Sequence, residues 1–254
     1  MTDYFPDQLS FIDQGVGQPT LVFLHYFSGA AASWQWVIDI LKAEYRCVAL
    51  DLPGFGNAPP LGSPSLKNYG AFVGQAISQL KLDRVVLIGH SMGGKIALQV
   101  AADHISPGLE QVVLVAPSPA TREPMPEAER DRLLAHPHSP ENAEKTVSSS
   151  SQMPLPAARQ SLAVETHIQA ADSAWRWWLL EGMNHSIADQ MERVQVPVTV
   201  LASSDDPVIP FQTIQQDVVN LLEPAELIVL GEVGHLIPLE APERLAQTIH
   251  QVIG

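Results

Sequence analysis

The chain alternates between short apolar runs rich in β-branched residues and longer segments whose apolar residues recur at helical spacing. Strands are predicted at residues 20–25, 45–52, 84–90, 110–117, 196–203 and 225–230. Helices are predicted at residues 32–42, 66–80, 92–105, 211–222 and 242–253. Strands and helices that alternate in this way form βαβ units. The sequence therefore predicts an α/β fold, a mostly parallel sheet flanked by helices.

Residues 118–189 interrupt this alternation. They contain many prolines, a polar "SSSSQ" tract and the helix-like pieces "EAERDRLLA" and "ADSAWRWWLLEGM", but no clear strand. Bare loops of this length are uncommon, and ligands of open parallel sheets bind beyond the carboxyl ends of the strands. We therefore expect an inserted helical cap, or lid, at 118–189 and a core made of residues 1–117 and 190–254. A partly disordered surface excursion is the alternative.

Composition and charge exclude several classes of function. The 254 residues carry a net charge of −14, whereas a nucleic-acid-binding protein normally presents a basic face. Cys47 is the single cysteine, so an internal disulfide is excluded and a buried apolar role is expected.

The first ten residues lack the features of a secretory signal, and no apolar run approaches the roughly 20 residues of a membrane span. We expect a cytoplasmic protein with a small-molecule substrate and no membrane span; its oligomeric state stays open.

The stretch "GHSMGGKI" at residues 89–96 fits two incompatible motifs. As G-x-x-x-x-G-K it resembles a phosphate-binding loop, but that loop needs Ser or Thr after the lysine to hold magnesium, and Ile96 stands there. As G-x-S-x-G it resembles a nucleophile elbow, in which a serine sits on a sharp turn between a strand and a helix. A buried strand is predicted before Ser91 and a helix after it, and Gly89 and Gly93 leave room for the turn. The context favours the elbow.

A serine nucleophile needs a general base, and the base needs a carboxylate to orient it. In elbow enzymes the three follow in the chain order Ser, Asp or Glu, His. The strand at 196–203 is followed by Asp205 and Asp206, and the strand at 225–230 is followed by His235. The other histidines have predicted places on helix ends, in the insertion or before Ser91. No cluster of His, Cys, Asp or Glu has metal-ligand spacing, so neither a metal nor another cofactor is expected.

Five motifs in order resemble the α/β-hydrolase-fold enzymes that carry a cap domain: "HYFSG", "DLPGFG", "GHSMGG", "SSDDPVIP" and "GHLIPLEAPERL". The resemblance covers nearly the whole chain outside the insertion. It implies Ser91 as nucleophile, His235 as base and Asp206, rather than Asp205, as the orienting acid. A serine at the elbow differs from the dehalogenases and epoxide hydrolases of this family, which have Asp there.

The resemblance also implies an oxyanion hole formed by two backbone N–H groups. One belongs to Met92, the residue after the nucleophile, and the other to Phe27 in the loop "HYFSG". The family usually has Gly where Tyr26 stands in this loop. Either the backbone at Tyr26 needs no positive φ, or the hole is altered and the phenol adds substrate contacts. His25 is expected to hold the loop by hydrogen bonds.

The function that these features favour is a serine hydrolase that cleaves carboxylic esters through an acyl-enzyme. Hydrolysis of carbon–carbon bonds, lactone opening and perhydrolysis stay open, because they use the same triad. A receptor that keeps the triad without turnover is an alternative of another class, and a nucleotide-binding loop that uses Lys95 is a third.

A small to medium, uncharged, largely apolar ester is the expected substrate. Trp175 and Trp178 are three residues apart and share one helix face in the insertion, whereas Trp177 points elsewhere. Trp175, Trp178 and Tyr26 are candidates for the pocket wall. The alternative is that the tryptophan rings only pack the insertion onto the core. The net charge of −14 disfavours an anionic substrate.

Overall fold

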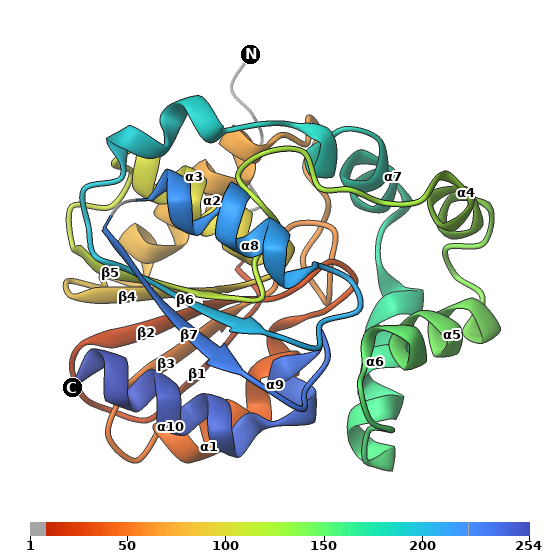
Figure 1. Ribbon diagram of the computed structural model, residues 1–254. Helices are drawn as coiled ribbons and strands as arrows, with labels where there is room; N and C mark the ends of the chain where they lie inside the picture. The colour runs from red at the N-terminus through yellow and green to blue at the C-terminus, as the bar shows by residue number, and fades with distance from the viewer. Residues whose placement is uncertain (1–8, 223) are drawn as a thin grey trace.

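The computed structural model describes residues 9–222 and 224–254. Most of the N-terminal segment in which no secretory signal was predicted, residues 1–8, lies outside the described part. Seven strands form one sheet in the order β1-β3-β2-β4-β5-β6-β7 (Figure 1). β1 is antiparallel to β3 and the other pairs are parallel. The strands are β1 (Phe11–Gln14), β2 (Thr20–Leu24), β3 (Cys47–Leu50), β4 (Val85–His90), β5 (Leu109–Val115), β6 (Val198–Ser203) and β7 (Ala225–Leu230).

Helices cover both faces of the sheet because successive residues of each central strand point to opposite sides. In β2, Leu21 and Phe23 pack in one apolar cluster with α1 (Gln35–Leu41) and α10 (Pro242–Ile253). Val22 and Leu24 pack in the other with α2 (Leu66–Gln79), α3 (Met92–Ala102) and α8 (Phe211–Asp217). Figure 1 shows these two sets of helices on either side of the sheet. The predicted α/β architecture is confirmed.

Outside residues 118–189, one strand and one short helix were not predicted from the sequence. β1 is a four-residue edge strand, "FIDQ", with an alternating exposed and half-buried pattern; one pairing partner and few apolar residues give it little sequence signal. α9 (Ile237–Glu240) is a single turn just before α10. The predicted helix at 211–222 divides into α8 and a 3₁₀ turn at Val219–Leu221.

Between β5 and β6 the chain forms α4 (Glu127–Ala135), α5 (Pro140–Ser150), α6 (Ala157–Gln169) and α7 (Asp172–Leu180). These four helices stand beside the sheet, at the edge where its parallel strands end (Figure 1). Two 3₁₀ turns, Gly182–Asn184 and Ala188–Arg193, lead back to β6. The helical content agrees with the expectation for residues 118–189; their separation from the core as a domain stays a prediction.

Within residues 9–222 and 224–254, no helix combines the length and the apolar character needed to cross a membrane. In the same residues, no group of three or more His, Cys, Asp or Glu side chains is arranged to hold a metal ion. Cys47 is fully buried in β3 as a free thiol, and burial raises its pKa to about 12.

Candidate active site

Ser91 lies at a sharp turn between β4 and α3, with φ +52° and ψ −116°. A side chain in this region of φ is strained and persists only where the surroundings hold it. The backbone N–H of Ser91 donates to the Val115 carbonyl at 3.0 Å, and its carbonyl accepts from the N–H groups of Gly94 and Ser118 at 2.9 and 3.0 Å. β4, β5 and α3 therefore fix the serine at the carboxyl end of the sheet.

The glycines beside Ser91 are required by close backbone approach. A Cβ atom on Gly93 would lie 2.5 Å from the carbonyl oxygen of Leu24 and 2.7 Å from that of His25. A Cβ atom on Gly89 would collide with the Gly93 carbonyl. Side chains at either position would push α3 away from the strands, as expected from the sequence.

His235 follows β7 and contacts both other members of the predicted triad. Its Nε2 atom lies 2.9 Å from Ser91 Oγ, and its Nδ1 atom lies 2.7 Å from Asp206 Oδ2. The remaining carboxylate oxygen, Asp206 Oδ1, accepts from the backbone N–H groups of Val208 at 2.7 Å and Ile209 at 2.9 Å. The two N–H groups fix the carboxylate, and the carboxylate fixes the ring with Nε2 directed at the hydroxyl.

Asp205 faces away from this arrangement. Its Oδ2 atom accepts from the Glu232 N–H at 2.8 Å and from the Ser204 hydroxyl at 2.9 Å. The Glu232 N–H and then the Ser204 hydroxyl lower the pKa of this carboxyl. Asp205 thus closes the β6 and β7 loops at the surface, and Asp206 is the residue that reaches His235.

Electrostatics raise the proton affinity of His235. Burial by itself lowers the pKa of His235, but Asp206, with smaller contributions from Glu123 and Glu240, more than offsets this, so the pKa lies above its ordinary 6.5. A ring that holds a proton well accepts one readily from a neighbouring hydroxyl. Ser91 and His235 are 6% and 4% exposed, which leaves little bulk water to compete for that proton.

The loop "HYFSG" runs beside Ser91 after β2. The backbone of Tyr26 does not adopt a positive φ, whereas the backbone of Ser28 does, at +72°. A tyrosine therefore fits this position without backbone strain, and its buried ring packs 5.2 Å from the His90 ring. Of the two expected oxyanion-hole donors, neither the Phe27 N–H nor the Met92 N–H has an acceptor within the described residues.

His25 ties this loop to the segment after β3. Its Nδ1 atom lies 2.7 Å from the Tyr26 carbonyl, and its Nε2 atom accepts from the Leu52 N–H at 3.0 Å. Burial lowers the pKa of His25 to about 4, so the ring is neutral and carries its proton on Nδ1. His25 positions the loop, as expected from the sequence.

A cavity of about 400 Å³ opens over Ser91 and His235. Tyr26, Phe27 and Trp178 line it together with apolar residues from α4 and the segment before it, from α5 and from the β6–α8 loop: Met125, Leu133, Val147, Pro207 and Val208. Trp175 is not part of the lining; it packs behind Phe27, with ring centroids 4.4 Å apart, and donates its indole N–H to the Leu133 carbonyl. Trp177 points elsewhere and stacks on Tyr69 at 4.7 Å. Of the candidates from the sequence, Tyr26 and Trp178 face the cavity.

Lys95 does not present its charge to a ligand. It is fully buried in α3, its Nζ atom donates to the Thr121 carbonyl at 2.8 Å, and burial lowers its pKa to about 8. A phosphate-binding lysine must project from the loop, so this placement argues against the nucleotide-binding interpretation.

Glu123 is a residue of the cavity wall that the sequence did not indicate. It lies in the segment between β5 and α4, flanked by Arg and Pro in "TREPMP", and no motif or periodicity marks it.

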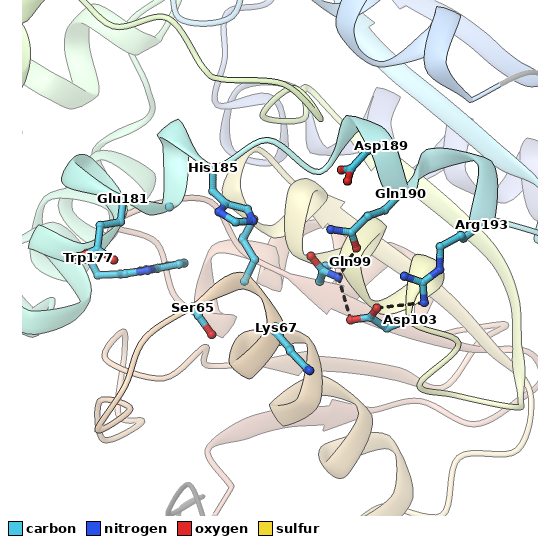
Figure 2. A pocket seen from close by; sticks show the side chains of 12 residues that line it. Ser65, Lys67, Gln99, Asp103, Trp177, Glu181, His185, Asp189, Gln190 and Arg193 are labelled. Carbon is cyan, nitrogen blue, oxygen red and sulfur yellow. Dashed lines mark hydrogen bonds and ion pairs between the residues drawn. The ribbon is translucent and has the colours of Figure 1, made fainter.

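A second groove, of about 560 Å³, lies between α2, α3 and the segment after α7 (Figure 2). Its polar groups bond to one another, since Gln99 donates to both Asp103 and Gln190. None of the predicted triad residues lines it.

Known proteins resemble this chain over most of its length. Residues 21–248 match the model of the alpha/beta hydrolase family. The chain is 26% identical to an uncharacterized hydrolase of Bacillus subtilis over 262 residues, which cover 94% of this chain and 92% of that protein. It is 37% identical over 91 residues to the dihydrolipoyllysine-residue acetyltransferase component of the acetoin cleaving system of Cupriavidus necator. That match covers 35% of this chain and spans only 24% of the acetyltransferase component.

A solved structure agrees in fold. The esterase from Exiguobacterium antarcticum superimposes with a TM-score of 0.85 at 20% identity, covering 96% of this chain and 94% of the esterase. At this level of identity the likeness concerns the fold. Together with the family match, it places the seven-stranded sheet and its flanking helices among known relatives. The chain belongs to the alpha/beta hydrolase family.

Proposed function

We propose that the protein is a serine hydrolase that cleaves carboxylic esters through an acyl-enzyme. The observation that carries the proposal is the continuous hydrogen-bonded chain from Ser91 Oγ through the His235 ring to Asp206, at 2.9 and 2.7 Å. Ser91 attacks the ester carbonyl while His235 Nε2 takes its proton. The imidazolium, held by Asp206, then gives that proton to the leaving alcohol. Water, activated by His235 in the same way, releases the acid and restores Ser91.

The negative charge on the carbonyl oxygen is stabilised in this proposal by the N–H groups of Phe27 and Met92. Two observations support these donors. Both are without an acceptor in the described chain, and Met92 begins α3, where the helix dipole favours an anion. Removal of one such donor typically slows an acyl-transfer enzyme by about 10²–10³.

The substrate is a small to medium, largely apolar ester that binds under the helices of residues 118–189. The apolar cavity wall supports this, since Met125, Leu133 and Trp178 are contributed by that segment and lie over Ser91. A cavity of about 400 Å³ is in the range that encloses a small organic molecule.

Turnover of p-nitrophenyl butyrate, combined with labelling by a fluorophosphonate probe, tests the proposal. Wild-type protein is expected to turn over the ester and to be labelled at Ser91, and Ser91→Ala is expected to lose both. Ser161→Ala, an exposed serine on α6, is the matched control and is expected to keep both. Labelling of another serine with unchanged turnover would contradict the assignment. Ligand-dependent thermal stabilisation without turnover would instead indicate a receptor.

A further inference from the structure

The cavity above Ser91 contains a carboxyl group whose hydrogen-bonding capacity the protein uses only in part. Glu123 lines the cavity and is 6% exposed. Its backbone N–H donates to the Met183 carbonyl at 2.8 Å, which anchors the residue under the insertion. Its Oε2 atom is fully buried, and in the part of the chain that the structure describes the group next to this carboxyl is the Ser118 hydroxyl, whose oxygen likewise forms no hydrogen bond of good geometry. Buried polar groups are nearly always paired, so this atom requires an explanation.

The charged groups around Glu123 are engaged elsewhere. Lys95 Nζ donates to the Thr121 carbonyl, and His235 and Asp206 pair with each other. Within residues 9–222 and 224–254, no cation lies within ion-pair distance of the Glu123 carboxyl. Burial raises the pKa of Glu123, and the adjacent Ser118 hydroxyl, His235 and Lys95 offset this only in part. Burial thus makes the charged carboxylate costlier than it is in water, and a partner that both donates and accepts suits either protonation state.

Resting on the function proposed above, we propose that Glu123 forms a subsite for a hydroxyl group of the ester substrate. A hydroxyl both donates and accepts a hydrogen bond, so it satisfies the carboxyl in either protonation state. The Glu123 carboxyl shares the cavity with Ser91 and His235, so one small molecule can contact it and the nucleophile. The apolar wall then holds the carbon skeleton, and Glu123 determines where an oxygen is accepted.

The charges of the cavity argue against an ionic group at this subsite. A substrate ammonium would compete with the buried Lys95 beside Glu123 and meet Lys145 on the cavity wall. A substrate carboxylate would approach the Glu123 carboxyl. On the same wall it would also meet the Glu129 carboxylate, which is paired with Arg132. An uncharged hydroxyl avoids both repulsions and leaves no unpaired charge in the cavity.

Two esters of equal shape test the proposal: p-nitrophenyl 3-hydroxybutanoate and p-nitrophenyl 3-methylbutanoate, which differ by a hydroxyl in place of a methyl. The measurement is the ratio of their kcat/KM values, divided by the ratio of their alkaline hydrolysis rates to remove intrinsic reactivity. Wild-type protein is expected to favour the hydroxy ester about tenfold in at least one enantiomer, the range of one hydrogen bond. Glu123→Gln, which retains a donor and an acceptor, is expected to keep a large part of the preference, and Glu123→Leu is expected to lose it.

Glu123→Leu separates a binding role from a structural one. It replaces a buried, unpaired polar group by an apolar group of similar size, so the melting temperature is expected to stay equal or rise. Turnover of the 3-hydroxybutanoate ester is expected to fall about tenfold relative to turnover of the 3-methylbutanoate ester. An equal loss on both esters would mean that Glu123 only supports the fold. Glu226→Gln, at an exposed position of β7, is the matched control and is expected to change neither ester.

The outcomes distinguish this proposal from the one on which it rests. If wild-type protein hydrolyses neither ester, the proposed ester hydrolysis is wrong. If it hydrolyses both with a corrected ratio near one, the hydroxyl subsite is wrong while ester hydrolysis stands. If p-nitrophenyl 3-aminobutanoate is the best of the three and Glu123→Gln removes that advantage, an ionised Glu123 binds a cation and the hydroxyl subsite is overturned.

Discussion

His235 Nε2 lies 2.9 Å from Ser91 Oγ, although 144 positions of the chain separate the two residues. Their loops follow β7 and β4, which are separated in the sheet by β5 and β6. A second bond fixes the same approach, because the His90 Nε2 atom lies 2.8 Å from the His235 carbonyl. The residue next to Ser91 thus holds the backbone of His235, while Asp206 holds its ring. Catalytic geometry of this kind depends on several loops and is sensitive to small displacements.

Asp206→Asn is expected to reduce kcat of ester hydrolysis by about four orders of magnitude. The Val208 and Ile209 N–H groups hold the amide oxygen, so the amide NH2 group faces His235 Nδ1 and selects the wrong tautomer. Asp205→Asn is expected to stay within a few-fold of wild type, since Asp205 bonds to Ser204 and the Glu232 N–H at the surface. Steady-state kinetics with p-nitrophenyl butyrate on both variants check this ranking. The reverse ranking would mean that the β6–α8 loop is arranged differently in solution.

The pH dependence of kcat/KM is expected to follow His235. The ring acts as a base only when neutral, so activity rises with pH and levels off above the pKa of His235. That pKa is raised above 6.5 because Asp206, aided by Glu123 and Glu240, outweighs the effect of burial. The midpoint is therefore expected above 6.5, and Asp206→Asn is expected to move it down. A midpoint below 6.5 in the wild type, measured at the isosbestic wavelength of p-nitrophenol, would contradict this arrangement.

The same shift links His235 to stability. A group whose pKa is raised by folding binds its proton more tightly in the folded state, so its contribution is fully present below the unfolded value of about 6.5. That contribution is lost as the pH rises through the folded pKa. His235→Gln is expected to flatten this part of the curve of unfolding free energy against pH, which urea titrations at several pH values measure.

Lys95 is expected to matter for folding rather than for chemistry. Lys95→Ala leaves a cavity in α3 and an unpaired Thr121 carbonyl, and we expect a loss of about 2–4 kcal/mol in the free energy of unfolding. Lys95→Met keeps most of the buried stem and is expected to lose less. Urea unfolding of both variants checks the order. Equal losses would mean that the ammonium group, not the stem, provides the stabilisation.

The sequence predicted those features of the fold and the candidate site that depend on local patterns and on the order of motifs along the chain. The elbow at Ser91 was predictable because glycines, a buried strand and a helix all occur within a few residues of it. The choice between Asp205 and Asp206 was not, because adjacent loop residues differ only in direction, and the family resemblance was needed to prefer Asp206. Glu123 was not predicted because its neighbours Ser118, Lys95 and His235 come from separate parts of the chain, and no short stretch of sequence brings them together. β1 escaped because an edge strand has little apolar pattern.

Gly93→Ala gives a sharp test of the elbow itself. The added methyl would lie 2.5 Å from the Leu24 carbonyl and 2.7 Å from the His25 carbonyl, both backbone atoms that cannot rotate away. Overpacking of this kind costs about 1–3 kcal/mol, and here it also displaces the loop that carries Phe27. We expect a lower melting temperature and a fall of at least tenfold in kcat.

Gly62→Ala is the matched control, because nothing lies within 4 Å of its added methyl. That variant is expected to be as stable as wild type or slightly more so, since alanine restricts the unfolded chain. Similar behaviour of the two variants in thermal unfolding and turnover would contradict the tight packing between Gly93 and the end of β2.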